Sequence, residues 1–196
     1  MSTSVREIVR AAGVTKPTLY YYFGSKEGLV RALVDEAFDE FERIIDHDLG
    51  QAHNAQDAII GLVFSYFTFC GQRPALARFL YSLIFGPAGE TTGVDVSDLV
   101  CRNRMLMEKV VDRAVGEGLI GRDKADMARV LLTGLVNVHI MGFIKGQVRA
   151  LDRDLAVRAV ALYLEGAGSP THQSRYGDGA RNPAEQRAGI DERKTE

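Results

Sequence analysis

The sequence predicts an all-α protein in which an N-terminal helix-turn-helix head is joined to an all-helical body. Apolar residues recur at the three- and four-residue spacing of one helix face through most of the chain. Capping residues and glycine or polar breaks divide these periodic segments into helices of ordinary length. The composition, 46% hydrophobic and 26% charged, is that of a soluble globular protein able to bury a sizeable core.

The first helix is predicted over residues 5–12. Ser4 and Glu7 stand three positions apart, as in a capping box, in which each side chain bonds a free backbone N–H of the helix start. Gly13 follows in the position at which a glycine commonly ends a helix.

A second short helix is predicted over residues 16–23. Thr15 can cap its free N–H groups, and Pro17 falls in the first turn, where no intrahelical donor is needed. Because only residues 13–15 separate the two helices, they predict a helix-turn-helix with 5–12 as the supporting helix and 16–23 as the reader. An ordinary pair of helices in a bundle is the alternative.

The outer faces of the reader carry groups suited to DNA. Leu19 and Phe23 lie four apart and are expected to face the core of the head. Ser25 can cap the next helix, and Lys26 stands at a helix start that does not favour a cation, so Lys26 is expected to serve a partner outside the helix. The phosphate-gripping and groove-reading side chains of the reader are Lys16, Thr18, Tyr21 and Tyr22.

The net charge of −2 is unevenly distributed along the chain. Basic residues exceed acidic ones in residues 1–31, whereas residues 32–50 hold one arginine among many carboxylates. A basic head on an acidic body is typical of a DNA-reading module whose remainder stays away from the phosphates.

Further helices are predicted through the body, and the one over 57–71 is apolar nearly all round, which favours a central position. The inward stripe of the first of them should consist of Leu29, Leu33, Ala37, Phe41 and Ile45, widened by Val30, Val34, Phe38 and Ile44. Their expected bounds are 26–49, 57–71, 74–85, 97–115, 124–148 and 152–165.

Three regions follow from this pattern. The expected head is 1–48, a helical ligand-binding and dimerisation domain is 49–168, and the polar tail 169–196 should be disordered. Within the body, the composition of residues 86–93 predicts a loop.

The last two predicted helices, near 124–148 and 152–165, are unusually apolar for the edge of a monomer. Gly134, Gly142 and Gly146 would allow close helix approach. Doubled by a two-fold axis, the two helices would bury each other in a four-helix interface, which predicts a homodimer. Packing on the chain's own core is the alternative.

The remaining patterns favour a cytoplasmic protein without catalytic or metal chemistry. Cys70 and Cys101 have apolar neighbours and are expected to be buried free thiols in a reducing compartment. No signal peptide is visible, and the apolar stretches around 58–70 and 130–144 are too short to span a membrane. The histidines show no ligand spacing and no catalytic motif occurs, so no enzyme, cofactor or metal site is predicted.

An apolar pocket in the body is expected to hold a small molecule. For each candidate, core packing is the alternative, and for Asn137 and His139 a satisfied polar pair at the dimer interface is a second one. The candidates are Phe64, Tyr66, Phe67, Met105, Met107, Asn137 and His139.

Taken together, the head motifs closely resemble the DNA-binding head of the TetR family of bacterial transcriptional regulators over about residues 3–48. The body resembles that family only in layout and helix number. The resemblance implies a homodimer that binds double-stranded operator DNA, most often as a repressor, and a small-molecule effector whose binding changes the spacing of the heads. The motifs that carry it are Thr3-Ser4-Val5-Arg6-Glu7-Ile8, Ala11-Ala12-Gly13-Val14, Thr18-Leu19-Tyr20-Tyr21-Tyr22-Phe23 and Ser25-Lys26-Glu27-Gly28-Leu29.

The resemblance also implies a role for individual residues of the head. Arg6 would point from the supporting helix toward a base edge or a phosphate, and Lys26 would clamp a phosphate from the next helix. The reader and its cap would meet bases and backbone through Thr15, Lys16, Pro17, Thr18, Tyr20, Tyr21 and Tyr22. Pro17 stands where many relatives carry glycine and Tyr22 where many carry histidine, so the DNA sequence that is read does not follow from the family.

Relatives place one more amphipathic helix before the supporting helix, whereas this sequence starts directly at the cap. Without that helix, Ile8, Val9, Leu29 and Leu33 would lose apolar cover. One hypothesis is a start codon assigned too late, which intact native protein beginning at Met1 would refute; truncation is the other. Two functions then compete: a ligand-responsive regulator, or a helical small-molecule-binding protein with a defective DNA-binding head. The effector, the operator and the regulated genes are not encoded in these patterns.

Overall fold

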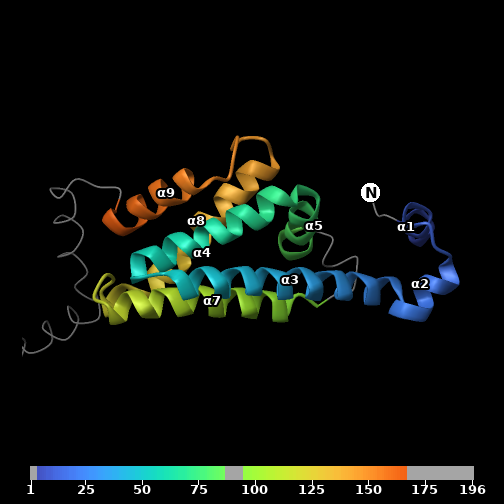
Figure 1. Cartoon of the computed structure of the whole chain (residues 1–196), viewed down its shortest axis with the longest axis horizontal. Coiled ribbons are helices and arrows are strands. Elements are labelled where there is room, and N and C mark those ends of the chain that lie inside the picture. The colour runs from blue at the N-terminus through green and yellow to red at the C-terminus, as the bar shows by residue number, and fades with distance from the viewer. Residues whose placement is uncertain (1–3, 87–94, 167–196) are drawn as a thin grey trace, which may run out of the picture. The chain divides into compact units, whose positions relative to one another are not determined.

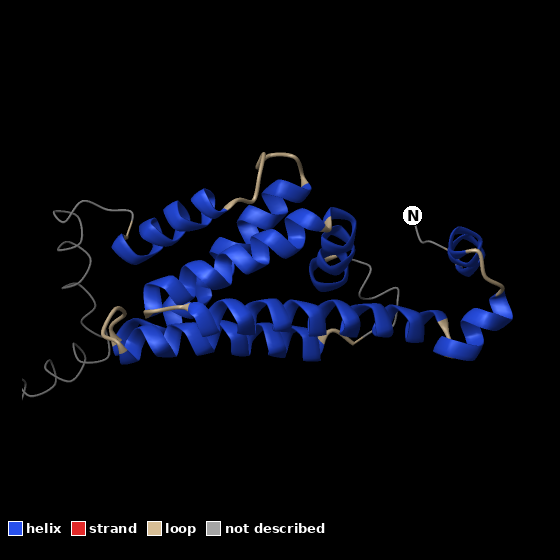
Figure 2. Ribbon diagram, in the orientation of Figure 1, coloured by secondary structure: helices blue, strands red, loops and turns tan. Residues whose placement is uncertain are grey.

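The described part of the chain is built of helices. The computed structural model describes residues 4–86 and 95–166, which contain α-helices, one short 3-10 helix and no strand (Figure 2). The predicted all-α fold, with a helix-turn-helix head followed by a helical body, is confirmed (Figure 1). The described elements are α1 (Val5–Ala12), α2 (Lys16–Phe23), α3 (Lys26–Gln51), α4 (Ala55–Gln72), α5 (Pro74–Phe85), α7 (Ser97–Gly116), η1 (Arg122–Lys124), α8 (Ala125–Ile144) and α9 (Arg153–Glu165).

The two helices of the head begin and end where the sequence predicts. Glu7 Oε2 accepts a hydrogen bond from the Ser4 backbone N–H at 2.7 Å, and Ser4 Oγ accepts one from the Glu7 N–H at 3.3 Å. Gly13 ends α1 with φ of 68°, a conformation that side chains with a Cβ rarely adopt. Thr15 Oγ1 accepts from the Thr18 N–H at 3.3 Å and caps α2.

A tight turn joins α2 to α3. Ser25 Oγ accepts from the Gly28 N–H at 3.0 Å and caps the third helix. A Cβ at position 28 would lie 2.0 Å from the carbonyl oxygen of Phe23, so glycine is required there. This contact fixes the direction in which α2 meets α3, against which it packs.

Near the head, only part of the predicted inward face of α3 is buried. Leu33 is 41% exposed, whereas Val30 and Val34, which were predicted to widen the stripe, are buried. Phe23, predicted in the core of the head, is 39% exposed because it ends α2 where the chain turns through Gly24. Farther along α3 the predicted stripe is buried at Ala37, Phe41 and Ile45.

Helix α4 is the central helix of the body, as its all-round apolar sequence predicts. It packs against α3, α5, α7 and α8, and Ile59, Leu62 and Phe67 expose no surface. The helix starts two residues earlier than predicted because Asn54 Oδ1 caps it, accepting from the Asp57 N–H at 2.8 Å.

Helix α7 runs beside α3 in the same direction (Figure 1). Lys109 Nζ lies 3.1 Å from Asp46 Oδ1, and farther along both helices Arg113 Nη2 donates to the Ala52 carbonyl at 3.2 Å. The order of these contacts makes the two helices parallel neighbours, so α7 holds the helix that carries the head.

The eighth helix ends at Ile144, four residues before the predicted end. The turn after it places Gly146 at φ of 74°, and the N–H of Val148 bonds the Gly142 carbonyl at 3.1 Å. A Cβ on Gly142 would lie 2.8 Å from a methyl of Val148. Gly142 therefore accommodates its own chain's turn rather than another helix, whereas the space beside Gly134 is open.

Two expectations drawn from composition need correction. Cys70 is a buried free thiol, but Cys101 is exposed on the outer side of α7. The helix over Arg122–Ile144, with mean hydropathy of 1.6, is long and apolar enough to cross a membrane by length and composition, although its stretch was expected to be too short. Only 28% of its most apolar stretch is buried, so much of the apolar surface of this helix faces outward.

The last helix begins as predicted, with Asp152 Oδ1 accepting from the Leu155 N–H at 2.8 Å. By its contacts the chain divides into residues up to Ala161 and a second unit from Leu162 onward. The domain boundaries expected after residues 48 and 168 stay predictions, and α3 is continuous across the first of them. The predicted tail 169–196, and the predicted loop beyond Gly86, lie outside the described residues.

Candidate nucleic-acid interface and body cavity

The predicted DNA contacts lie on the outer surface of the head. Tyr21 and Tyr22 are 83% and 71% exposed, and their rings meet edge to face at 5.2 Å between centroids. Leu19, at 4% exposed, anchors α2 in the head. The other exposed predicted contacts are Arg6, Thr15, Lys16, Pro17 and Tyr20, while Thr18 and Lys26 are half-buried.

Not every predicted contact is equally free to meet a partner. The hydroxyls of Thr15 and Thr18 lie 2.8 Å apart, and Thr15 holds the cap of α2, so its main role is to set the start of the reader. Glu7, the acidic residue of α1, is engaged in the capping box, and the Ser4 backbone and side chain, with a smaller effect from Lys26, lower its pKa. The outer surface of α1 and α2 is therefore dominated by cationic and aromatic groups, which suit phosphates and groove walls.

A cavity of about 410 Å³ lies in the body between α3, α4, α5, α7 and α8. This volume is within the range of small-molecule sites. Its walls are mostly aromatic and aliphatic side chains, among them Phe38, Phe41, Phe69, Leu80, Ile84 and Leu99.

Two tyrosine–asparagine pairs supply most of the polar atoms of this cavity. The Tyr66 hydroxyl donates to Asn103 Oδ1, and the Tyr81 hydroxyl donates to Asn137 Oδ1 at 2.8 Å. Burial raises the pKa of both tyrosines and raises the pKa of the Cys70 thiol to about 12, so all three groups are neutral at physiological pH.

The cavity brings together two of the predicted ligand contacts, Tyr66 and Asn137. His139 bonds the Leu135 carbonyl through Nδ1 at 2.7 Å, and its ring lies 5.6 Å from the ring of Phe67, a core residue, at an interplanar angle of 46°. Of the others, Phe64 lies beneath the guanidinium of Arg153, Met107 is core, and Met105 is 59% exposed. Sequence reasoning missed the partners Tyr81 and Asn103 and the walls from α3 and α5, which no local pattern marks.

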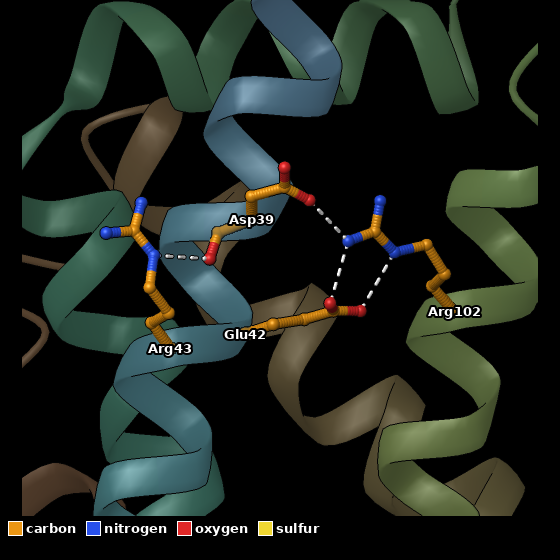
Figure 3. Close-up of polar contacts among 4 residues, drawn as sticks. All are labelled: Asp39, Glu42, Arg43 and Arg102. Atoms are coloured by element: carbon orange, nitrogen blue, oxygen red, sulfur yellow. Dashed lines mark hydrogen bonds and ion pairs between the residues drawn. The ribbon is translucent and has the colours of Figure 1, made fainter.

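A charged cluster lies where α7 passes α3 (Figure 3). Arg102 of α7 donates to both carboxylate oxygens of Glu42 at 2.7 and 2.8 Å and to Asp39 at 2.8 Å. These hydrogen bonds raise the pKa of Arg102. Arg43 instead bonds the Asp39 carbonyl of its own helix at 3.0 Å, on the other side in Figure 3.

Phe38 connects this cluster to the cavity. The Arg102 guanidinium lies 5.1 Å from the centroid of the Phe38 ring, and the ring lines the cavity. A second cavity of about 300 Å³ shares Phe38 and Leu99 with the first but is polar, with Arg31, Asp35, Asp95, Asp98 and Arg102 in its walls. Among the described residues, no group of His, Cys, Asp and Glu is arranged to hold a metal ion.

Comparison with known proteins identifies the head. Residues 1–33 match the family model described as bacterial regulatory proteins, tetR family. The probable HTH-type transcriptional regulator YttP of Bacillus subtilis is 31% identical over 81 residues, 40% of this chain and 39% of that protein. The HTH-type transcriptional regulator EthR of Mycolicibacterium smegmatis is 32% identical over 76 residues, 38% of this chain and 35% of that protein. The chain thus matches these relatives over about two-fifths of their length or less.

Solved structures share the fold over most of the chain. The regulator FadR from Bacillus subtilis, in complex with stearoyl-CoA, matches with a TM-score of 0.69 and 17% identity, over 85% of this chain and 89% of that one. The TetR family regulator PfmR from Thermus thermophilus matches with a TM-score of 0.65 and 20% identity, over 85% and 90%. Residues 1–33 thus match the tetR family of bacterial regulatory proteins by sequence, and the chain shares the fold of solved TetR family regulators.

Proposed function

We propose that this protein is a ligand-responsive transcriptional regulator, acting as a repressor that binds operator DNA as a homodimer and is released by a small-molecule effector. The observation that carries the proposal is the exposed face of α2, on which Lys16, Tyr21 and Tyr22 stand on a helix anchored by Leu19. Two such faces would enter successive major grooves about 34–36 Å apart. This role suits a cytoplasmic protein without catalytic chemistry.

The exposed apolar side chains of α8 support the proposal of a homodimer. Met127, Val130, Leu131 and Val138 recur along one side of it and are 55–70% exposed, with the open side of Gly134 between them. A stripe of this kind is costly to leave in water, and its spacing is that of a helix packed against a second helix. A second copy of α8 and α9 across a two-fold axis would cover it.

The body cavity is the place we assign to the effector. Two structural neighbours are named for such molecules: FadR of Bacillus subtilis was solved with stearoyl-CoA, and KstR2 of Mycobacterium tuberculosis is a ketosteroid regulator, with a TM-score of 0.52. Helix α3 forms one wall of the cavity and begins at the turn that holds the reader. A molecule that displaces Phe38 would act on that helix and bias the spacing of the two heads.

The alternative function, a small-molecule-binding protein whose head does not bind DNA, has one observation in its favour. Phe23 and Leu33 of the head are about two-fifths exposed, at 39% and 41%, which is unusual for apolar residues of a finished core.

Fluorescence anisotropy with labelled duplex DNA distinguishes the regulator from the alternative function. If Arg6, Lys16 and Lys26 each contact a phosphate, a dimer makes about six such contacts, and its affinity should fall roughly a thousandfold between 50 and 200 mM salt. Sedimentation of the same sample should give twice the chain mass of 21.5 kDa. If the chain did not bind the duplex at 50 mM salt, the regulator would be ruled out and the alternative function would remain.

A further inference from the structure

Among the described residues, no charged group lines the body cavity. Its lining residues from α3, α4, α5, α7 and α8 are aromatic, aliphatic, amide, hydroxyl and thiol side chains. The groups able to ionise, Tyr66, Tyr81 and Cys70, are held neutral by burial. A charged ligand would find no counter-ion among these described side chains, and an unpaired charge in an apolar site is strongly disfavoured.

The neighbouring polar cavity does not provide a receptor for an anion either. Arg102 in its wall is already bonded to Asp39 and Glu42 of α3. The remaining guanidinium, from Arg31, stands among the carboxylates of Asp35, Asp95 and Asp98. A carboxylate or phosphate that extended from the apolar cavity would therefore meet mainly negative charge.

The apolar cavity instead offers unused hydrogen-bond donors. Asn103 and Asn137 each accept a tyrosine proton through Oδ1, and within the described residues neither amide NH2 makes a hydrogen bond. An asparagine amide carries two donors in its NH2 group. The two amides come from different helices, α7 and α8, so a ligand can be held at either or at both.

We infer that the cavity binds an uncharged, largely apolar molecule whose carbonyl, ester or ether oxygen accepts a hydrogen bond from Asn103 or Asn137. This inference rests on the proposed effector role of the cavity and adds the chemical class of the molecule. Aromatic and aliphatic walls bind the hydrocarbon part, and the asparagine amides fix its oxygen.

Calorimetric titration of the full chain with decan-2-one, decanoate and decylammonium tests the class, because the three have hydrocarbon parts of similar length but differ in charge. Decan-2-one should bind about tenfold or more tightly than either ion. If decanoate or decylammonium bound as tightly as the ketone, the inference would be overturned, but the proposal that the cavity binds the effector would remain. If none of the three bound, the inference and the effector part of the proposed function would both fail. The DNA-binding part would be unaffected, because the anisotropy experiment tests it independently.

Variants test the donors. Asn137→Leu alone strands the Tyr81 hydroxyl, so the double variant Tyr81→Phe with Asn137→Leu removes both partners together and is expected to keep the fold. The affinity of this double variant for decan-2-one should be about two- to tenfold lower than that of the parent chain. If the Asn103 amide is the donor, the same loss is expected from Tyr66→Phe with Asn103→Leu. The matched control is Gln56→Leu, an exposed amide on α4 outside the cavity, which should bind the ketone unchanged. Unchanged ketone affinity in both double variants, with circular dichroism as for the parent chain, would overturn the assignment of the donors.

Discussion

A Lys16→Glu, Lys26→Glu double variant is expected to bind DNA roughly a thousandfold more weakly than the parent chain at 0.15 M salt. In a dimer the two changes remove four phosphate contacts. Each contact raises the affinity for DNA about fivefold at this salt concentration, because it releases counterions from DNA. The four new carboxylates would add repulsion from the phosphates. Fluorescence anisotropy against the same labelled duplex measures the loss.

The two positions are well suited to charge reversal because folding should tolerate it. Lys16 is the first residue of α2 and Lys26 the first of α3. A glutamate at a helix N-terminus interacts favourably with the helix dipole, whereas a lysine does not. Thermal unfolding followed by circular dichroism should therefore show a midpoint equal to or above that of the parent chain, so weaker DNA binding would not reflect loss of the fold.

A body variant with the same change in net charge is the control. Arg78 on α5 and Arg104 on α7 are exposed, and Arg104 makes only a 3.6 Å pair with Glu108 one turn away. Arg78→Glu with Arg104→Glu should keep DNA affinity within about threefold, because neither residue belongs to the head. Equal losses in the two double variants would show that net charge, and not the head, governs binding.

The Arg102→Met variant is expected to lower the free energy of unfolding by about 1 kcal/mol. The change removes the two bonds to Glu42 and the bond to Asp39, while methionine keeps much of the apolar contact with Phe38. Hydrogen bonds between charged groups contribute about 1.5–3 kcal/mol when buried, but the Arg102 side chain is 32% exposed, so solvent reduces the effect. For a chain of this length, 1 kcal/mol corresponds to a fall of roughly 2–4 °C in the thermal midpoint.

Arg104→Met, two residues along the same helix, is the control for that experiment. The Arg104 side chain is 69% exposed and its partner Glu108 is on its own helix, so its removal should cost less than about 0.5 kcal/mol. Urea unfolding of both variants measures the difference. Equal stabilities of the two variants would mean that the Arg102 cluster does not hold α7 to α3, and the path from cavity to head through Phe38 would lose its support.

The sequence predicts the head well because its signals are local. The capping box of Ser4 and Glu7, the cap at Thr15 and the glycine at position 13 each lie within a few residues of the helix end that they define. The end of α8 was missed because the contact that decides it, between Gly142 and Val148, forms only once the chain has turned back at Gly146.

The cavity was predicted only in part because its polar pairs join distant segments. Tyr66 and Asn137 stand out as polar groups on apolar helices, but their partners Asn103 and Tyr81 are 37 and 56 residues away in the chain. Side-chain type alone does not separate a cavity wall from packing. Phe67 and Met107, which look equally suitable, expose at most 1% of their surface in the core.

Hydroxyl-radical footprinting on a duplex selected by this protein from random sequences tests the central claim most directly. The account predicts that selection yields an inverted repeat, and that bound protein protects two patches on one face of the duplex with centres about 10–10.5 base pairs apart, or a multiple of that spacing. The Lys16→Glu, Lys26→Glu variant should give no protection at the same concentration. A selected pool without sequence enrichment, or uniform weak protection along the duplex, would contradict the claim that two copies of this head read DNA.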